Sequence, residues 1–518
     1  MKILFRFFRA IIDVVMISAL PVFVSCDELD LIGGENPDEE LHTIDEYLNL
    51  EITKLKAFSA RFEGMLTVDD SALSSTVFIL YYSDEMIVDP TTLKCVYIAN
   101  FDQDKSIKID LRGLECNKKY YYVLYVKHNS IDYYSEVFDF TTAENPHEKT
   151  YDLDVTSAVD LSAAGSANSY IVSEPGLYKI RTVKGNSNES IGAVSSASIL
   201  WETYGTDEDI YPGDLVEGVC CKDGYIIFQT SDLEYDNKGN ALIAAHDAVG
   251  TILWSWHIWF TEQPKGQVYY NDAGTMMDRN LGATTALPDD VHSLGLLYQW
   301  GRKDPFLNTN SIEFHGNFAD NVRAKSTGSW PTEVVLTSPE IGTIEYTIVN
   351  PMTCINSYEE NEDWFYTGNI TTDNTRWTTS DKEKSIYDPC PYGWRVPDGG
   401  PNGVWAKALG TSEKIANTNI QEKEAGVNLS GLLGDDEVIW YPESGFVAPW
   451  DCSNWYVGWD GRYWSATPSD NRFNTFMCYG LTCNYFDWAS VNKPETTSVT
   501  SVALSSRRYA YAVRCIKE

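Results

Sequence analysis

ILWSWHIWF, residues 252–260, is the strongest strand signal in the chain. At a period of two, five large apolar side chains fall on one face of an extended strand: Ile252, Trp254, Trp256, Ile258 and Phe260. This face predicts the core side of a β-sheet. His257 lies on the opposite face beside Ser255 and Trp259, where we interpret it as a surface or packing residue.

Further strand signals surround this stretch. The runs 169–172 and 178–180 lie on either side of Pro175-Gly176, a turn signal, and 224–228 is another apolar run. We therefore predict a β-sandwich module over residues 150–263. Cys220 and Cys221 are adjacent, and we expect them not to pair with each other, because a vicinal disulfide would be strained.

Residues 46–144 predict a second, smaller sandwich that precedes this module. Short β-rich runs are separated by turn residues, as in packed antiparallel sheets: 76–82, 107–111, 120–126 and 137–141. Leu114 with Tyr120 resembles the tyrosine-corner region of fibronectin type III domains, and 138–142 resembles their last strand. Cys95 and Cys116 either pair across this module or remain two separate thiols. The polar segment 145–149 predicts a hinge.

Length, composition and charge limit the number of domains and the class of partner. A chain of 518 residues suggests two to four domains, and 43% hydrophobic residues suffice for ordinary cores. The formal charge of −36 repels nucleic acid, so we expect no nucleic-acid partner.

The first 26 residues have the layout of a secretion signal. A basic start with Lys2 and Arg6 precedes the apolar run 10–24, which is too short for a stable membrane span. Phe23-Val24-Ser25-Cys26 resembles a bacterial lipobox, which implies that Cys26 is acylated, for example with palmitate, and becomes the first mature residue. The alternative is an ordinary cleaved signal with a chance cysteine.

Residues 27–45 read as an acidic flexible tether. The stretch resembles the acidic export signal of outward-facing lipoproteins, which implies an outer-membrane lipoprotein on the cell exterior. An inward-facing orientation is the alternative. Ten of the 11 cysteines follow Cys26 and none forms a CxxC pair, so disulfides or buried thiols are favoured over metal. We predict no metal and no cofactor.

The last predicted domain, 264–518, mixes Trp-rich loops with short elements. One short helix is predicted at 404–409, and a weaker one at 297–300. Five blocks resemble the FISUMP-type major paralogous domain of bacterial surface lipoproteins: Met277–Ala283, Gly295–Phe306, Tyr387–Pro397, Gly461–Ser465 and Ala512–Cys515. This resemblance implies an α+β, C-type-lectin-like fold that is also similar to formylglycine-generating enzymes. The whole chain is thus predicted to be multidomain and mainly β.

Cysteines and arginines within the blocks suggest structural roles. The strongest disulfide candidate is Cys390–Cys515; Cys478 and Cys483 flank a possible turn at 479–480, which leaves Cys354 and Cys452 as a residual pair. Three arginines lie in apolar surroundings, and we expect aspartate partners among Asp278, Asp388 and Asp398. These arginines are Arg279, Arg395 and Arg514.

The sequence favours a binding protein over an enzyme. A Ser-His-Asp pattern, a P-loop, a dinucleotide fingerprint and HExxH are all missing, so we predict no catalytic residues. Aromatic residues cluster in a Gly/Pro/Asn-rich stretch: Trp440, Tyr441, Trp450, Trp455, Tyr456, Trp459, Tyr463 and Trp464. Core packing explains several of them. We select Trp455, Tyr456 and Trp459 as the ligand-binding candidates, for an extracellular glycan or protein.

Three alternatives remain. Residues 168–178 resemble fimbrillin-associated surface proteins, which would make the chain a structural accessory or tip subunit that contacts fimbrial subunits. Cys478 and Cys483 loosely resemble the active-site cysteines of formylglycine-generating enzymes, which would imply an enzyme. The acidic runs 289–290 and 435–437 would suit calcium, although solvated loop charge is the commoner explanation.

Overall fold

The computed structural model divides the chain into two compact units, Met1–Asn145 and Pro146–Glu518. It describes residues 44, 47–68, 73, 75–98, 105–128, 130–232, 238–308, 323–357, 362–366, 368, 373–410, 415–416, 421–423, 426–469, 477–484 and 498–518. The predicted signal 1–26, with Cys26, and the tether 27–45 apart from Ile44 lie outside the described residues. No helix in the described ranges is long and apolar enough to cross a membrane.

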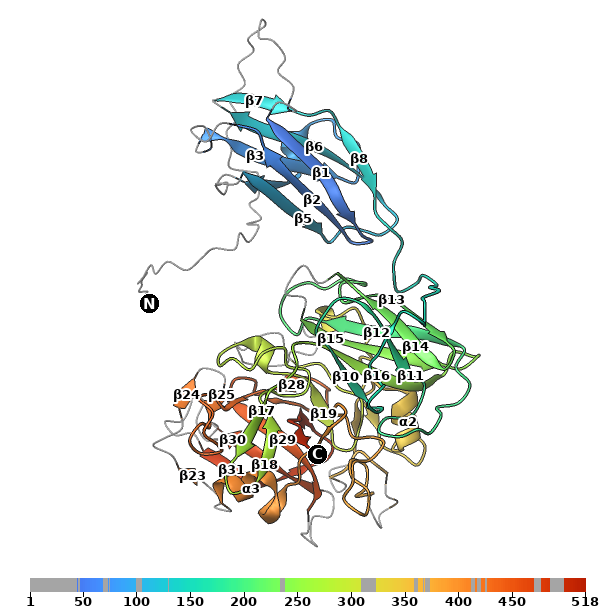
Figure 1. Cartoon of the computed structure of the whole chain (residues 1–518), viewed down its shortest axis with the longest axis vertical. Helices are drawn as coiled ribbons and strands as arrows, with labels where there is room; N and C mark the ends of the chain where they lie inside the picture. Colours follow the sequence, from blue (N-terminus) through green and yellow to red (C-terminus); the bar gives the residue numbers. More distant parts are fainter. Residues whose placement is uncertain are drawn as a thin grey trace, which may run out of the picture. The chain divides into compact units, whose positions relative to one another are not determined.

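The first unit is a β-sandwich (Figure 1). One sheet has the order β1-β2-β5, and the other has the order β4-β3-β6-β7 with β8 on β6. The strands are β1 Leu48–Leu55, β2 Ser59–Leu66, β3 Val77–Ser83, β4 Lys94–Ile98, β5 Ser106–Arg112, β6 Lys119–His128, β7 Ile131–Tyr134 and β8 Phe138–Thr141. Ile44, at the end of the predicted tether, already packs into this core.

A tyrosine corner identifies the type of sandwich. The backbone N–H of Glu115 donates to the hydroxyl of Tyr120 over 2.9 Å, which is the backward hydrogen bond that defines this corner. Together with the strand order, this bond confirms the predicted fibronectin type III-like module. The optional Cys95–Cys116 pairing is wrong, because Cys95 is disulfide-bonded whereas Cys116 is a free thiol.

The second unit begins with two four-stranded sheets, in the orders β10-β16-β15-β12 and β13-β14-β11-β9. The first comprises β10 Ser169–Val172, β12 Ser196–Thr203, β15 Gly239–His246 and β16 Ile252–Phe260. The second comprises β9 Val159–Asp160, β11 Leu177–Arg181, β13 Val216–Lys222 and β14 Tyr225–Thr230. Trp254, Trp256 and Ile258 lie in the core between them, which confirms the predicted inner face of 252–260. Cys220 and Cys221 are both free thiols.

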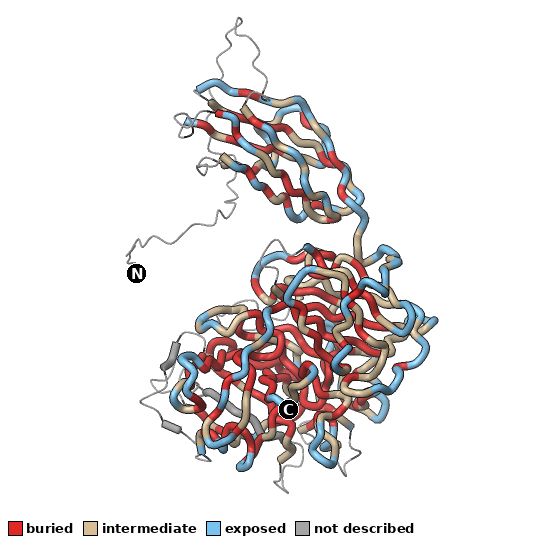
Figure 2. Tube along the Cα trace, viewed as in Figure 1, coloured by how far each residue is buried: buried red, intermediate tan, exposed pale blue. Residues whose placement is uncertain are grey.

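The outer face of the β10-β16-β15-β12 sheet is also buried. Trp201, Leu242 and Trp259 belong to a second hydrophobic cluster that they share with residues from the C-terminal part of the chain. In Figure 2 buried residues form a continuous region through this unit. The structure therefore joins the predicted domains 150–263 and 264–518 in one compact unit, because they share the two sides of one sheet.

His257 is part of this buried outer face. It is 1% exposed, and its Nε2 and Nδ1 contact Asn240 Oδ1 at 2.8 Å and Ser169 Oγ at 2.9 Å. Burial lowers the pKa of His257 to about 3, so the ring is neutral and serves the packing of the sheet.

The rest of the second unit has short elements connected by long loops. The largest sheet has the order β23-β31-β30-β29-β32-β27-β28 with β19 on β32, and a smaller one has the order β17-β18-β33-β22. The remaining strands pair as β20-β21 and β24-β25-β26. The strands are β17 Gly266–Tyr269, β18 Gly274–Met277, β19 Leu297–Gln299, β20 Val335–Leu336, β21 Ile355–Asn356, β22 Trp394–Arg395, β23 Ile415–Ala416, β24 Gln421–Lys423, β25 Gly426–Asn428, β26 Trp440–Pro442, β27 Phe446–Val447, β28 Asn454–Trp455, β29 Asp460–Pro468, β30 Met477–Asn484, β31 Ser498–Ser506, β32 Ala510–Ala512 and β33 Ile516–Lys517.

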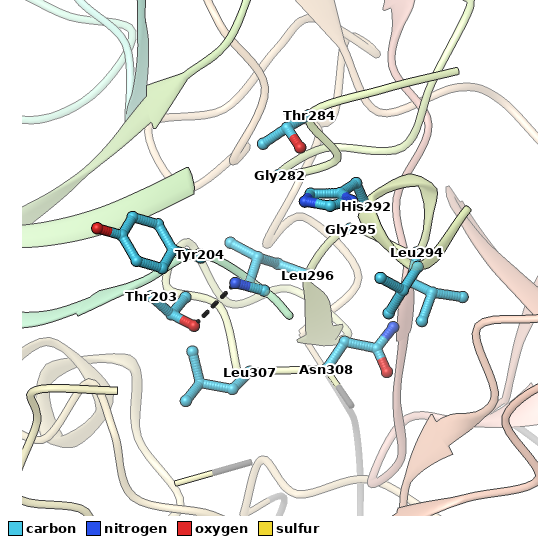
Figure 3. A pocket seen from close by; sticks show the side chains of 12 residues that line it. Thr203, Tyr204, Gly282, Thr284, His292, Leu294, Gly295, Leu296, Leu307 and Asn308 are labelled. Atoms are coloured by element: carbon cyan, nitrogen blue, oxygen red, sulfur yellow. Dashed lines mark hydrogen bonds between the residues drawn. The ribbon is translucent and has the colours of Figure 1, made fainter. Parts of the chain in front are cut away.

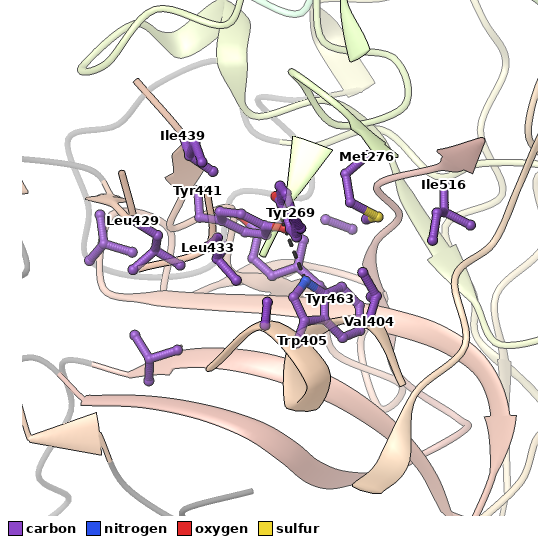
Figure 4. Close-up of a cluster of buried hydrophobic side chains, with 14 of the residues drawn as sticks. Tyr269, Met276, Val404, Trp405, Leu429, Leu433, Ile439, Tyr441, Tyr463 and Ile516 are labelled. Carbon is purple, nitrogen blue, oxygen red and sulfur yellow. Dashed lines mark hydrogen bonds between the residues drawn. The ribbon is translucent and has the colours of Figure 1, made fainter. Parts of the chain in front are cut away.

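Short α-helices accompany these strands in the part of the chain that the structure describes, among them α2 (Ile344–Val349) and α3 (Val404–Leu409). The second matches the predicted helix 404–409. The weaker helix prediction at 297–300 is wrong, because 297–299 form β19, which pairs antiparallel with β32. In Figure 4, α3 places Trp405 in a buried cluster where its indole N–H donates to the hydroxyl of Tyr441 over 3.0 Å.

The segment around Cys390 is tied down from several sides. A disulfide joins Cys390 to Cys515, as predicted. The Asp388 carboxylate accepts backbone N–H groups from Cys390 and Val396, each over 2.8 Å. The ammonium of Lys384 donates to the carbonyls of Cys390 and Pro391 over 3.0 and 2.8 Å. These polar contacts satisfy a buried, irregular stretch of backbone.

The possible Cys478–Cys483 loop is not formed. Both residues lie on the single strand β30, where Cys478 pairs with Pro468 and Cys483 with Gly461. Five residues of extended chain span about 16 Å, which is beyond the reach of a disulfide. The predicted turn at 479–480 is absent because the backbone there pairs with β29 and β31.

Two of the three predicted arginine pairings are present. Arg279 makes a two-point ion pair with Asp278, at 3.0 and 3.1 Å, and Arg395 contacts Asp398 over 2.7 Å. Arg514 has different contacts: it donates to the side-chain oxygen of Asn280 over 3.2 Å and lies over a Tyr441 ring, 3.9 Å from its centroid.

Replacing Trp259 tests whether the second unit is a single cooperative body. Trp259→Ala removes a fully buried ring and its 3.0 Å hydrogen bond to the Ala283 carbonyl. We expect a loss of about 3–5 kcal/mol in the free energy of unfolding. Urea unfolding followed by tryptophan fluorescence measures it, because all 16 tryptophans lie in the second unit. Two separate transitions, with only one of them shifted, would contradict a single unit.

Asp388 predicts a specific pH dependence. Burial raises its pKa to about 6, against opposing contributions from Lys384 and the two backbone donors. The unfolded value is about 3.9, so the stabilisation by this group is complete below about pH 4 and is lost as the pH rises through about 6. The expected loss is about 3 kcal/mol.

The same fluorescence experiment between pH 4 and 7 tests this. Asp388→Asn cannot ionise, so the difference in unfolding free energy between the natural chain and this variant should change with pH across that window. A constant difference would show that Asp388 has an ordinary pKa.

Candidate ligand-binding surface

A short hairpin near the end of the second unit carries the most exposed tryptophan among the described residues. Strands β27 and β28 pair through Phe446 with Trp455 and through Val447 with Asn454. The connecting loop is closed by two backbone bonds of 2.9 Å, from Ala448 N to Ser453 O and from Cys452 N to Ala448 O. This closed loop holds Trp450 outward, with 51% of its surface exposed.

Trp450 belongs to a group of neighbouring rings that we call the aromatic surface: Trp450, Trp455, Tyr456 and Tyr509. Trp450 meets Trp455 at 6.0 Å between centroids and Tyr509 at 5.9 Å, both nearly edge to face. Trp455 contacts Tyr456 at 6.1 Å. Tyr509 comes from a distant part of the sequence and is brought here by the pairing of Val447 with Ala510.

The aromatic surface rests on a rigid base. Phe446 is buried and contacts the rings of Tyr509 and Tyr456 at 5.3 and 5.7 Å. The guanidinium of Arg462 lies 4.6 Å from the centre of the Phe446 ring and is held by Asp460 over 2.7 Å. Because Asp460 is itself buried, this ion pair is shielded from solvent and fixes the base from below.

The predicted site residues lie in this region, but the most exposed ring is not one of the three that the sequence selected. Trp455 and Tyr456 are half-buried members of the aromatic surface. Trp459 is half-buried in the following turn, where its backbone N–H donates to the Tyr456 carbonyl. Trp440 and Trp464 are core residues. Within this aromatic stretch the most exposed ring is that of Trp450, which the sequence grouped with the others but did not select, since exposure within a loop leaves no periodic signal.

The hollows of the second unit differ in size. One, shown in Figure 3, is lined by Thr203, His292 and Leu296 among others and has a volume of about 20 Å³, room for about one water molecule. His292 contacts Asp290 over 2.8 Å there, which raises the pKa of His292. This hollow is too small for an organic ligand.

A wider polar groove of about 310 Å³ is lined by Arg181, Lys384 and Tyr392 among others, at the lower end of the range for ligand pockets. The Tyr392 ring is 56% exposed and lies against Gly165, where a Cβ would come within 2.1 Å of the ring. Only glycine allows this approach. The groove is therefore a second place where a small polar ligand would fit.

One carboxylate in each of the two acidic runs that the sequence offered for calcium accepts a hydrogen bond from a protein donor. Asp290 accepts the backbone N–H of His292 over 2.9 Å, and Asp435 accepts the hydroxyl of Tyr270. Among the residues that the structure describes, no three His, Cys, Asp or Glu side chains gather as metal ligands do.

Comparison with solved structures finds matches to parts of the chain. A sensor domain of the anti-sigma factor RsgI4 from Pseudobacteroides cellulosolvens is 21% identical, with 19% of this chain and 95% of that chain covered, at a TM-score of 0.15. The fibronectin type III domain of human fibronectin type III domain containing protein 3 is 15% identical, with 23% and 100% covered, at a TM-score of 0.16. The FN1–FN3 domains of chicken CNTN1 are 9% identical, with 46% and 75% covered, at 0.15.

Scores of this size assign neither a fold nor an activity to the chain as a whole. No family model and no curated protein sequence matches the chain.

Proposed function

We propose that this chain is a lipid-anchored cell-surface protein that binds an extracellular glycan or protein through its aromatic surface. The observation that carries the proposal is the half-exposed Trp450, which a closed hairpin loop and the neighbouring rings hold in place. A fixed aromatic ring binds with little loss of side-chain entropy, and that favours recognition.

The chemistry of the surface favours a neutral glycan. Aromatic faces bind the apolar C–H faces of sugar rings, and the half-buried rings beside Trp450 widen the contact. The formal charge of −36 disfavours a polyanionic ligand, because approach would be opposed by the field of the whole chain.

We further propose that residues 264–518 are a FISUMP-type domain with a C-type-lectin-like fold. Support comes from the five sequence blocks, whose residues carry buried structural contacts. Arg279 and Arg514 are buried in hydrogen-bonded sites, and Cys390 is bonded to Cys515.

Replacing Trp450 tests the binding proposal. Trp450→Ala removes a half-exposed ring and no core side chain, so we expect at least a tenfold loss of affinity for a glycan found on an array, with an unchanged midpoint of unfolding. Surface binding and calorimetry measure the two quantities on the whole ectodomain.

Tyr392→Ala is the matched control, because it removes an exposed ring from the polar groove instead. It should leave the affinity unchanged. If Tyr392→Ala abolishes binding while Trp450→Ala does not, the groove is the site. Co-purification with a polymeric fimbria, with no glycan or protein ligand, would favour the accessory-subunit alternative.

The anchor has its own test. Cys26→Ser removes the only thiol that the proposed lipobox could acylate, so metabolically incorporated palmitate should disappear and the protein should leave the membrane fraction. Equal palmitate labelling of the variant and the natural chain would refute acylation at this position.

A further inference from the structure

The loop that carries Trp450 also carries a cysteine that meets a second cysteine from the core. Cys452 lies in this loop with a left-handed backbone, φ 53°. Cys354 immediately precedes β21, and its carbonyl accepts the N–H of Val335 over 3.1 Å. The two residues pack in the same hydrophobic cluster, and their thiols hydrogen-bond to each other.

The surroundings make the two thiols unequal. Arg323 donates to the Cys452 carbonyl over 3.3 Å and faces the thiol. The Cys354 hydrogen bond, with a smaller contribution from Arg323, lowers the pKa of Cys452, whereas the same hydrogen bond and burial raise the pKa of Cys354. Cys452 is therefore the better nucleophile.

The two cysteines also differ in exposure to solvent. Cys452 is partly exposed and Cys354 is buried. Of the two residues, Cys452 has the more exposed surface, so the exchange begins at Cys452, and Cys354 is in place to react second.

We propose that Cys354 and Cys452 are a redox site that closes to a disulfide by exchange with a low-molecular-weight disulfide, and that this bond fastens the Trp450 loop to the core. This pair differs from Cys390–Cys515, which is already bonded. The proposal is independent of what the aromatic surface binds.

The exchange takes two steps. The Cys452 thiolate attacks one sulfur of the donor disulfide, the donor S–S bond breaks, and one donor thiolate leaves. The Cys354 thiol then gives its proton to solvent and attacks Cys452 Sγ, which releases the second donor thiolate. The protein is oxidised by two electrons, the donor is reduced by two, and the two departing thiolates take up the two protons.

The bond has two measurable consequences. It removes freedom from the unfolded chain, so the unfolding midpoint of the second unit should rise by about 5 °C or more. It also tethers the loop between β27 and β28, so amide hydrogen exchange in residues 448–455 should slow several-fold.

The experiment uses the whole chain, treated either with dithiothreitol or with oxidised glutathione, followed by alkylation. Peptide mass spectrometry should find Cys354 linked to Cys452 after oxidation, with the loss of two hydrogens, while Cys220 and Cys221 are alkylated in both samples. Alkylation of Cys354 and Cys452 in both samples would overturn the proposal, as would an unchanged exchange rate in 448–455.

Two serine variants separate this result from a general effect of oxidant. Cys354→Ser and Cys452→Ser conserve volume closely, so each should fold and show the fast loop exchange of the reduced chain in both treatments. Slow exchange in an oxidised serine variant would show that another modification restrains the loop, and would also overturn the proposal.

Discussion

The second unit depends on a β-sheet that has no solvent side. Strands β10, β16, β15 and β12 bury one face against the partner sheet and the other against the C-terminal part of the chain. Buried polar groups on that outer side are matched: Ser255 accepts the Lys303 ammonium at its carbonyl over 3.0 Å and donates to Asp304 over 2.6 Å. Lys303 and Asp304, in the loop after β19, form a buried ion pair. Such a pair is tolerated only when hydrogen bonds complete it, so the sheet and this loop hold each other in place.

This arrangement explains which parts of the fold the sequence could predict. The period of two in 252–260 correctly gave a strand and its inner face. It could not reveal the second buried face, because Ser255, His257 and Trp259 suit a surface as well as an interface, and only residues distant in sequence decide between them. The predicted domain boundary near residue 263, which the structure does not show, has the same cause. Local patterns show where strands end, but not whether the next segment covers them.

The disulfides and the candidate site show the same limit. Cys390 was recognisable because prolines and a glycine fix its surroundings, and its partner Cys515 lies in a matching block. The spacing of Cys478 and Cys483 suggested a turn, yet pairing with two neighbouring strands extends this segment. Trp455 and Tyr456 could be predicted from composition. The exposure of Trp450 and the arrival of Tyr509 depend on the closed loop and on strand order, which composition does not encode.

The position of the last strand has a consequence for biosynthesis. Strand β33 lies between β18 and β22, and Cys515 beside it bonds to Cys390. The described strands of the first unit lie within residues 48–141, so that unit can fold before the remainder of the chain has emerged. The second unit has to wait for residues 515–517. Until then its tryptophan-rich sheets lack a strand and expose apolar surface, the condition under which incomplete chains aggregate, so this interval is the period in which a chaperone would matter most.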